Sequence, residues 1–232
     1  MRAVTSLAGG IAHDFNNLLF AIMGNIEMAQ HFSGTSQAAR LDRAYQSCLE
    51  AKQLIRRFLE MAESDWIGKQ TRPIADMIQQ AVNTRLQESA RIQYKIKLSG
   101  GLYSASYAYD QMLQVMANIL SNAEQAIPGG GTITVSAENV AVQDELLTGP
   151  TPLRPGKYLK ISIADTGIGI PADILDRIFD PYFTTRREPA SRGHGLGLTT
   201  VMAVVKRHKG NISVESVPGK GTIVTLYLPA AL

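Results

Sequence analysis

The stretch YLKISIADTGIGIP, residues 158–171, places a glycine-rich turn directly after a strand. Asp165 ends the strand, and Gly167 and Gly169 leave the backbone bare just beyond it. An ionised carboxylate only accepts hydrogen bonds, so this arrangement suits a flat ring with an exocyclic amino donor, such as adenine. An ordinary glycine turn with an aspartate cap would contain the same residues, and the stretch by itself leaves both interpretations open.

Strands and helices alternate around this stretch. Apolar residues alternate with polar ones over 92–98, which predicts a half-buried strand, and three more segments have strand composition: 132–140, 211–217 and 222–228. Helices are expected over 75–86, over 109–127 with Asp110 as the N-cap, and over 198–210 with Gly210 ending the helix. Strands with helices on one face form an α/β sandwich. The proline-rich residues 141–157 are expected to form a surface excursion between two strands.

The first part of the chain has a different pattern. All ten prolines lie at or beyond Pro73, so residues 1–70 lack the strongest helix breaker. Helical spacing predicts two long helices joined by a turn at 31–36, with apolar faces formed by Leu7, Ile11, Leu18, Ile22, Ile26 and Ala29, and by Leu41, Ala44, Cys48, Ala51, Ile55, Phe58 and Ala62. One such hairpin buries too little apolar surface to be stable, so a four-helix bundle of two chains is expected.

These patterns predict an α+β protein with two domains. A dimeric helical hairpin is expected over residues 1–66, a linker over 67–72 and an α/β sandwich over 73–232. The composition, 45% hydrophobic and 19% charged over 232 residues, is typical of globular proteins. A net charge of +3 without long basic runs disfavours nucleic-acid binding. The single cysteine and the absence of a membrane-length apolar run favour a soluble, cytoplasmic chain without direct membrane contact, which could be the cytoplasmic portion of a longer sensor.

A polar stripe follows one face of the helix expected over 109–127. Gln114, Asn118 and Asn122 lie four residues apart, and asparagine is a poor helix former. An amide oxygen is a ligand for Mg²⁺, which takes its other ligands from water and nucleotide phosphates. A solvated polar face explains the same spacing.

A second glycine cluster, RGHGLGLTT (192–200), opens the last helix. Gly193, Gly195 and Gly197 would expose backbone N–H groups at the positive end of the helix dipole, which favours phosphate. No Gly-Lys-Ser/Thr follows, so the cluster is not a Walker A loop. Residues 176–191, between the glycine clusters, carry aromatic residues and Arg186. They are predicted to form a mobile flap in which Arg186 could bind phosphate.

The first helix carries SLAGGIAHDFNNLL (6–19). His13 lies about 200° from the apolar line through Ile11, so it is expected to face solvent, with Asn17 one turn further on the same face. Imidazole can act as a nucleophile, and the adjacent Asp14 can orient it or take its proton. A histidine that is simply exposed is the alternative.

Together these segments resemble the two-component sensor histidine kinases. AHDFNNLL (12–19) resembles the H-box, NILSNAEQA (118–126) the N-box, DTGIGI (165–170) the G1 box, IFDPYFTT (178–185) the F-box, GHGLGL (193–198) the G2 box and GKGT (219–222) the last glycine box. The boxes occur in the family's order and together cover nearly the whole chain. The form GGIAHDFNNLL is similar to the nitrogen-regulation and hybrid-kinase branch.

The resemblance implies a role for each matching residue. His13 would be the phospho-acceptor, Asp14 its base, and Asp14 with Asn17 the pattern linked to phosphatase activity. Asn122 would bind Mg²⁺ with Asn118 in support, and Asp165 would bind adenine. The remaining nucleotide-binding positions would be Gly167, Gly169, Arg186, Gly193, Gly195, Leu196 and Gly197. The implied substrate is ATP with Mg²⁺, the implied assembly is a homodimer, and the implied partner is a response regulator receiver domain.

Two positions depart from the family pattern. Gln125 replaces a basic residue that many members use to contact phosphate, and His194 replaces a small hydroxyl residue. The residues also allow two other functions: a gyrase-like ATPase and a non-enzymatic phosphorelay scaffold. Gyrase-like ATPases usually have an acid where this chain has Asn118, and the intact glycine boxes disfavour a degenerate nucleotide domain.

Overall fold

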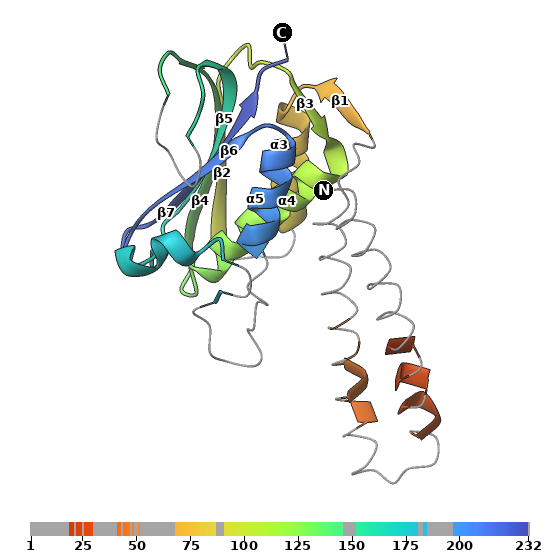
Figure 1. The fold of residues 1–232 in the computed structure, drawn as a ribbon. Helices are drawn as coiled ribbons and strands as arrows, with labels where there is room; N and C mark the ends of the chain where they lie inside the picture. Colours follow the sequence, from red (N-terminus) through yellow and green to blue (C-terminus); the bar gives the residue numbers. More distant parts are fainter. Residues whose placement is uncertain are drawn as a thin grey trace. The chain divides into compact units, whose positions relative to one another are not determined.

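The chain divides into two compact units, Met1–Asp65 and Trp66–Leu232, which are described separately. The computed structural model describes residues 19–20, 22–24, 26–29, 41–42, 44–46, 48, 51, 68–86, 91–145, 152–180, 183–184 and 197–231 (Figure 1). No helix among these residues is long and apolar enough to cross a membrane.

The second unit is built on a five-stranded sheet with the order β2-β4-β5-β7-β6. The strands are β2 (Ile92–Leu98), β4 (Gly131–Val142), β5 (Gly156–Asp165), β6 (Asn211–Val217) and β7 (Gly221–Pro229). β2 runs parallel to β4, and the other neighbours are antiparallel. Asp165 pairs with Ile133 of β4 and with Thr222 of β7. The end of β5 is therefore held between two neighbouring strands.

Three helices cover one face of this sheet (Figure 1). They are α3 (Ala75–Leu86), α4 (Tyr109–Gln125) and α5 (Gly197–Arg207). One apolar cluster joins them to the sheet, and its fully buried members include Ile78, Met116, Leu120, Ile161, Val201 and Leu226. The alternation of β5 and β7 sends every second side chain into this cluster. The predicted α/β sandwich is confirmed.

A small second sheet was not expected from the sequence. β1 (Lys69–Arg72) pairs antiparallel with β3 (Ala105–Ala108), and Lys69 lies opposite Ala108. β1 falls within residues 67–72, which the sequence predicted to be a linker. Its residues KQTR have no apolar alternation, because the strand is short and mostly exposed. The strand forms because it pairs with β3, although its composition does not predict a strand.

Two predicted helix ends are wrong. The N-cap of α4 is Ala108 without a side-chain cap, and Asp110 lies in the first turn, where its charge complements the helix dipole. At the end of α5, the residue with positive φ is Lys209 (55°), not Gly210. The Gly210 N–H donates to Val205 O (3.0 Å) and the Lys209 N–H to Lys206 O (2.9 Å), as in a Schellman motif. Gly210 is needed because a Cβ there would lie 2.4 Å from Tyr227 O.

The described part of the first unit contains contacts between the two predicted helices. Leu19, Met23, Ile26 and Cys48 are buried and pack with Leu41, Ala44, Tyr45 and Ala51. Ile22, which the sequence placed on the inner face, is 47% exposed, and Phe20 and Met28 are more exposed still. The inner face is therefore shifted from the predicted line toward Leu19 and Met23, and apolar side chains remain exposed on other sides of the first helix.

The buried His208 connects α5 with α4. Its Nδ1 lies 2.8 Å from Val204 O, and its Nε2 accepts a hydrogen bond from the Ala108 N–H at 3.0 Å. This pairing holds the neutral imidazole with the proton on Nδ1. Burial lowers the pKa of His208, the Val204 carbonyl opposes this shift, and the positive charges of Lys69 and Arg207 add to it.

We expect the stability of the second unit to fall as the pH drops below about 6.5, the usual histidine pKa. The folded state holds His208 neutral, so the unfolded state binds more protons in this range and is stabilised relative to the folded state as the pH falls. His208→Gln should lower the melting temperature at pH 7.5. It should also make the melting temperature change less between pH 7.5 and 5.5 than it does in the wild type. Thermal denaturation at several pH values measures both, and an unchanged slope in the variant would contradict this assignment.

Candidate functional site

The carboxylate of Asp165 lies at the end of β5, and the residue is 9% exposed. Its Oδ1 accepts hydrogen bonds from the Gly167 N–H (2.8 Å) and the Thr222 N–H (3.3 Å). Oδ2 accepts none from the part of the chain that the structure describes. The described residues leave no fully buried side-chain oxygen without a partner, so Oδ2 reaches solvent. One oxygen is thus used to orient the group, and the other is open to a ligand.

The environment of Asp165 acts on its protonation in two directions. Burial raises the pKa of the Asp165 carboxyl, and the N–H groups of Gly167 and Thr222 lower it, with burial the larger effect. A ligand that donates a hydrogen bond to Oδ2 would favour the ionised form in the same way as these two backbone donors.

The two glycines of the loop after β5 are required by close backbone packing. A Cβ at Gly167 would lie 2.4 Å from Ala126 O at the end of α4. Gly169 has a φ of +71°, and a Cβ there would lie 2.2 Å from Val217 O. The sequence interpretation, in which the missing side chains make room for a bound ring, is therefore incomplete: both glycines let the loop approach protein backbone.

The loop is joined to α4 and to the turn between β6 and β7. Ile168 donates its N–H to Ala126 O (3.0 Å), and Gly219 donates its N–H to Ile168 O (2.8 Å). These two hydrogen bonds and the glycine contacts place the loop between the end of α4 and the β6–β7 turn. The position of Asp165 therefore depends on three segments that are distant in sequence.

Asn118 and Asn122 of α4 differ in their surroundings. Asn118 Oδ1 accepts a hydrogen bond from Gln114 Nε2 at 3.1 Å. No hydrogen bond to the side chain of Asn122 is found within the described ranges. Asn122 Nδ2 lies 3.8 Å from the position of a Cβ on Gly197, the first residue of α5. The C-terminal part of α4 and the start of α5 therefore meet at Asn122.

The donor set at this place fits a magnesium ion that takes most ligands from water and phosphate. The amide of Asn122 is available, and the described residues contain no group of three or more His, Cys, Asp or Glu side chains that could hold a metal by themselves. Mg²⁺ uses few protein ligands when it is bound together with a nucleotide. The amide oxygen of Asn118 is already engaged by Gln114, so Asn122 is the better ligand of the two.

Several predicted site residues cannot be placed. His13, Asp14, Asn17, Arg186, Gly193, Gly195 and Leu196 lie outside the described residues. The predicted flap starts within the short helix η1 (Ala172–Arg177). Phe179 packs against the main core, and its carbonyl accepts a hydrogen bond from Thr199 Oγ1 (3.0 Å). The start of the flap is thus anchored to α5.

Sequence reasoning missed the hydroxyl groups that support the site. Ser216 Oγ accepts a hydrogen bond from the Ile170 N–H (2.8 Å), donates one to Gly221 O (3.0 Å) and lies 2.8 Å from Thr222 Oγ1. The only signal was the GKGT box at 219–222, which marks the turn but does not single out Ser216.

The side of α4 opposite Asn122 is held by a second group of side chains. Glu124 accepts a hydrogen bond from the Tyr94 hydroxyl of β2 and pairs with Arg85 of α3 at 3.7 Å. Residues two positions apart on a helix point about 200° apart, so Glu124 attaches the last turn of α4 to the sheet while Asn122 faces α5.

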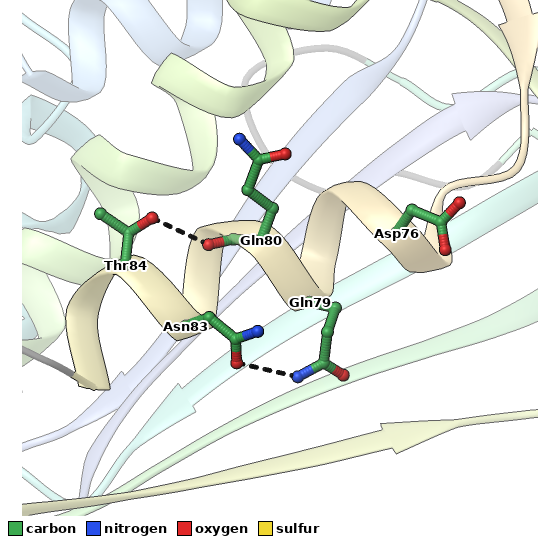
Figure 2. Close-up of a pocket in the computed structure, with 5 residues that line it drawn as sticks. All are labelled: Asp76, Gln79, Gln80, Asn83 and Thr84. Carbon is green, nitrogen blue, oxygen red and sulfur yellow. Dashed lines mark hydrogen bonds between the residues drawn. The ribbon is translucent and has the colours of Figure 1, made fainter.

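A shallow hollow on α3 is not part of this site (Figure 2). It is lined by Asp76, Gln79, Gln80, Asn83 and Thr84, all from one helix. Figure 2 shows their hydrogen bonds, from Gln79 to Asn83 and from Thr84 to the Gln80 carbonyl. The Gln80 side chain also accepts a hydrogen bond from the Tyr109 hydroxyl of α4, and none of these residues belongs to the group around Asp165.

Comparison with known families agrees with this geometry. Residues 108–232 match the family "Histidine kinase-, DNA gyrase B-, and HSP90-like ATPase", and residues 3–65 match the "His Kinase A (phospho-acceptor) domain". The chain belongs to this ATPase family and has the domain pair of a two-component histidine kinase catalytic core. The predicted family and fold class are confirmed.

Curated relatives include sensor kinases. The chain is 33% identical to the sensor kinase CckA of Brucella abortus over 99% of its own length and 24% of that protein. It is 34% identical to the sensor histidine kinase ZraS of Escherichia coli over 98% of its length and 46% of that protein. The chain thus spans between a quarter and a half of these relatives.

Solved structures share the fold. Full-length ShkA in complex with AMPPNP superimposes with a TM-score of 0.72 at 19% identity, covering 98% of this chain and 46% of that one. The mycobacterial sensor histidine kinase MprB gives a TM-score of 0.55 at 21% identity, covering 70% of this chain and 97% of that one.

We expect Gly167→Ala to destabilise the second unit by about 1–3 kcal/mol, because the new methyl group would overlap the Ala126 carbonyl. Gly100→Ala is the matched control, since a Cβ at Gly100 has no atom within 4 Å. Urea denaturation of both variants measures the difference. Equal stability of the two variants would show that the loop does not depend on this contact.

Proposed function

We propose that this chain is the catalytic core of a sensor histidine kinase, which transfers the γ-phosphoryl group of ATP to His13 and from there to an aspartate of a response regulator receiver domain. The observation that carries the proposal is the open Oδ2 of the buried Asp165, beside a loop that is joined to the end of α4. The matches to a phospho-acceptor domain and an ATPase family support the same conclusion.

The nucleotide is bound by groups of the second unit. Asp165 Oδ2 accepts a hydrogen bond from the exocyclic amino group of adenine, and the loop through Gly167 and Gly169 orients that carboxylate. The phosphates lie toward the start of α5, where Gly197 begins the helix and its dipole favours negative charge. Gly193, Gly195 and Leu196 contribute backbone to the phosphate site, and Arg186 supplies a cation.

Asn122 is the proposed ligand for Mg²⁺, and Asn118 supports it through the polar face that it shares with Gln114. When bound, Mg²⁺ neutralises charge on the phosphates. This chain's own contribution is to hold the side-chain amide of Asn122 next to the start of α5, where the phosphates are expected.

Phosphoryl transfer begins at His13. An imidazole nitrogen attacks the γ-phosphorus of ATP, the bond between that phosphorus and the β,γ-bridging oxygen breaks, and ADP leaves. Asp14 orients the ring and takes the proton from its other nitrogen or stabilises the imidazolium that forms. The phosphoryl group then passes to a receiver aspartate. Asn17, one turn further along, is proposed to position a water for the reverse dephosphorylation of that regulator.

The chain is proposed to act as a homodimer. Phe20, Ile22 and Met28 are 47–60% exposed, although they lie on the first helix next to the buried contacts of Leu19 and Met23. A second copy would cover part of this exposed apolar surface and complete a four-helix bundle. Because ATP is the phosphoryl donor, we place this part of the protein in the cytoplasm.

An ATPase that only hydrolyses nucleotide is a weaker explanation. Hydrolysis needs a base to activate water, and the residue one turn before Asn122 is Asn118, whose amide is a poor base and accepts a hydrogen bond from Gln114. The match of residues 3–65 to a phospho-acceptor domain also favours transfer to protein.

His13→Ala is expected to abolish labelling of the chain by γ-labelled ATP while leaving the dissociation constant for ATP within twofold. The label on the wild-type chain should be stable in base and labile in acid, as a phosphoramidate is. Labelling that survives in His13→Ala would exclude this histidine as the acceptor.

Asn122→Ala is expected to weaken ATP binding by about tenfold in the presence of Mg²⁺ and by much less in its absence, because one metal ligand is lost. Calorimetry with and without Mg²⁺ separates these cases. Gln111→Ala is the matched control, because Gln111 is an exposed residue of the first turn of the same helix, far along α4 from Asn122. Equal losses for Asn122→Ala in both conditions would contradict the metal role.

A further inference from the structure

Four residues from separate parts of the second unit meet at one point, here called the junction: Lys69, Ala108, Arg207 and His208. Lys69 Nζ donates a hydrogen bond to Arg207 O at 2.8 Å. The Ala108 N–H donates to His208 Nε2 at 3.0 Å. Lys69 and Ala108 are directly opposite each other in the β1–β3 ladder. The two cross-strand partners therefore both bind the C-terminal end of α5.

Each contact at the junction uses a group that secondary structure leaves unpaired. Arg207 is the last residue of α5, where carbonyl groups have no partner within the helix and carry the negative end of the dipole. The ammonium of Lys69 satisfies such a carbonyl and complements its charge. Ala108 is the N-cap of α4, and its N–H is satisfied by the imidazole of His208.

The junction lies at the opposite ends of α4 and α5 from the proposed nucleotide site. α4 runs from Ala108 at its N-cap to Asn122 near its other end, roughly 21 Å away at 1.5 Å per residue. α5 runs from Gly197 beside Asn122 to Arg207 at the junction, about 15 Å away. The two helices pack along their length (Figure 1). The two helices are thus hydrogen-bonded to each other at the junction and lie close together at the other end.

The strand at the junction is the first element of the second unit. β1 begins at Lys69, close in sequence after the boundary between the units at Asp65 and Trp66, and it is the first strand among the described residues of the second unit. The other end of β1 is also held. The buried Tyr107 donates a hydrogen bond from its hydroxyl to the carbonyl oxygen of Pro73, which directly follows β1, at 2.9 Å.

We infer that Lys69 and His208 are positioning residues for phosphoryl transfer, an inference that rests on the proposed kinase function. They fasten the strand that follows the interdomain segment to the two helices that carry the nucleotide site. The connection between the units therefore leaves the nucleotide-binding unit from a defined point. Loosening the junction leaves nucleotide binding intact and slows the transfer to His13, because transfer depends on how the bound nucleotide is presented.

The test uses three lysine variants of the full chain. Lys69→Met removes the ammonium but keeps an unbranched side chain only one atom shorter, Lys69→Arg keeps a cationic donor, and Lys95→Met is a control on an exposed lysine of β2. We expect Lys69→Met to slow the labelling of His13 at saturating ATP by about tenfold, with the ATP dissociation constant within twofold of wild type. Lys69→Arg should recover most of the rate, and Lys95→Met should equal wild type.

Amide hydrogen exchange provides the structural readout. In Lys69→Met, the amides of residues 69–72 and 105–108 should exchange faster, while those of β4 and β5 stay protected. A wild-type rate in Lys69→Met, a loss of ATP affinity equal to the loss of rate, or no recovery in Lys69→Arg would each overturn the inference. A wild-type chain that binds ATP but is never labelled would instead overturn the kinase proposal, and this inference with it.

Discussion

The Asp165 carboxylate is held by two backbone N–H groups that come from different segments, and most features of the site follow from this arrangement. Gly167 donates from the loop after β5, and Thr222 donates from the start of β7. Both bonds go to the same oxygen, so the other oxygen stays open. Keeping this geometry requires the loop to lie against the Ala126 carbonyl of α4 and against Val217 of β6, where no side chain fits at Gly167 or Gly169. The orientation of one carboxylate therefore sets the packing of three segments.

The paired helices α4 and α5 connect the site with the rest of the unit. At one end, Asn122 lies beside Gly197, and Glu124 ties the same turn to Tyr94 and Arg85. At the other end, His208 joins the start of α4 to the end of α5, and Lys69 brings in the first strand of the unit. A nucleotide bound between Asp165 and Gly197 would therefore contact two helices whose opposite ends are bound to β1, the first described strand of the unit.

The sequence predicted what depends on local pattern. The alternation of 92–98 and the strand composition of 211–217 gave the bounds of β2 and β6, and the ordered boxes gave the family. Contacts between distant segments left no such pattern. β1 is polar because it is exposed, Lys209 rather than Gly210 takes the positive φ, and Ser216 gains its role only through the turn that faces it. Gly167 and Gly169 were identified, but the backbone atoms that they accommodate could not be read from their own neighbours in the chain.

The open oxygen of Asp165 is proposed to bind the amino group of adenine, and a double-mutant cycle measures that interaction. The cycle compares the dissociation constants of ATP and of purine riboside triphosphate, which lacks the 6-amino group, in wild type and in Asp165→Asn. A hydrogen bond to a charged group contributes about 1.5–3 kcal/mol, so wild type should prefer ATP by about one to two decades. We expect Asp165→Asn to lose most of this preference. An equal preference for ATP in both proteins would contradict it.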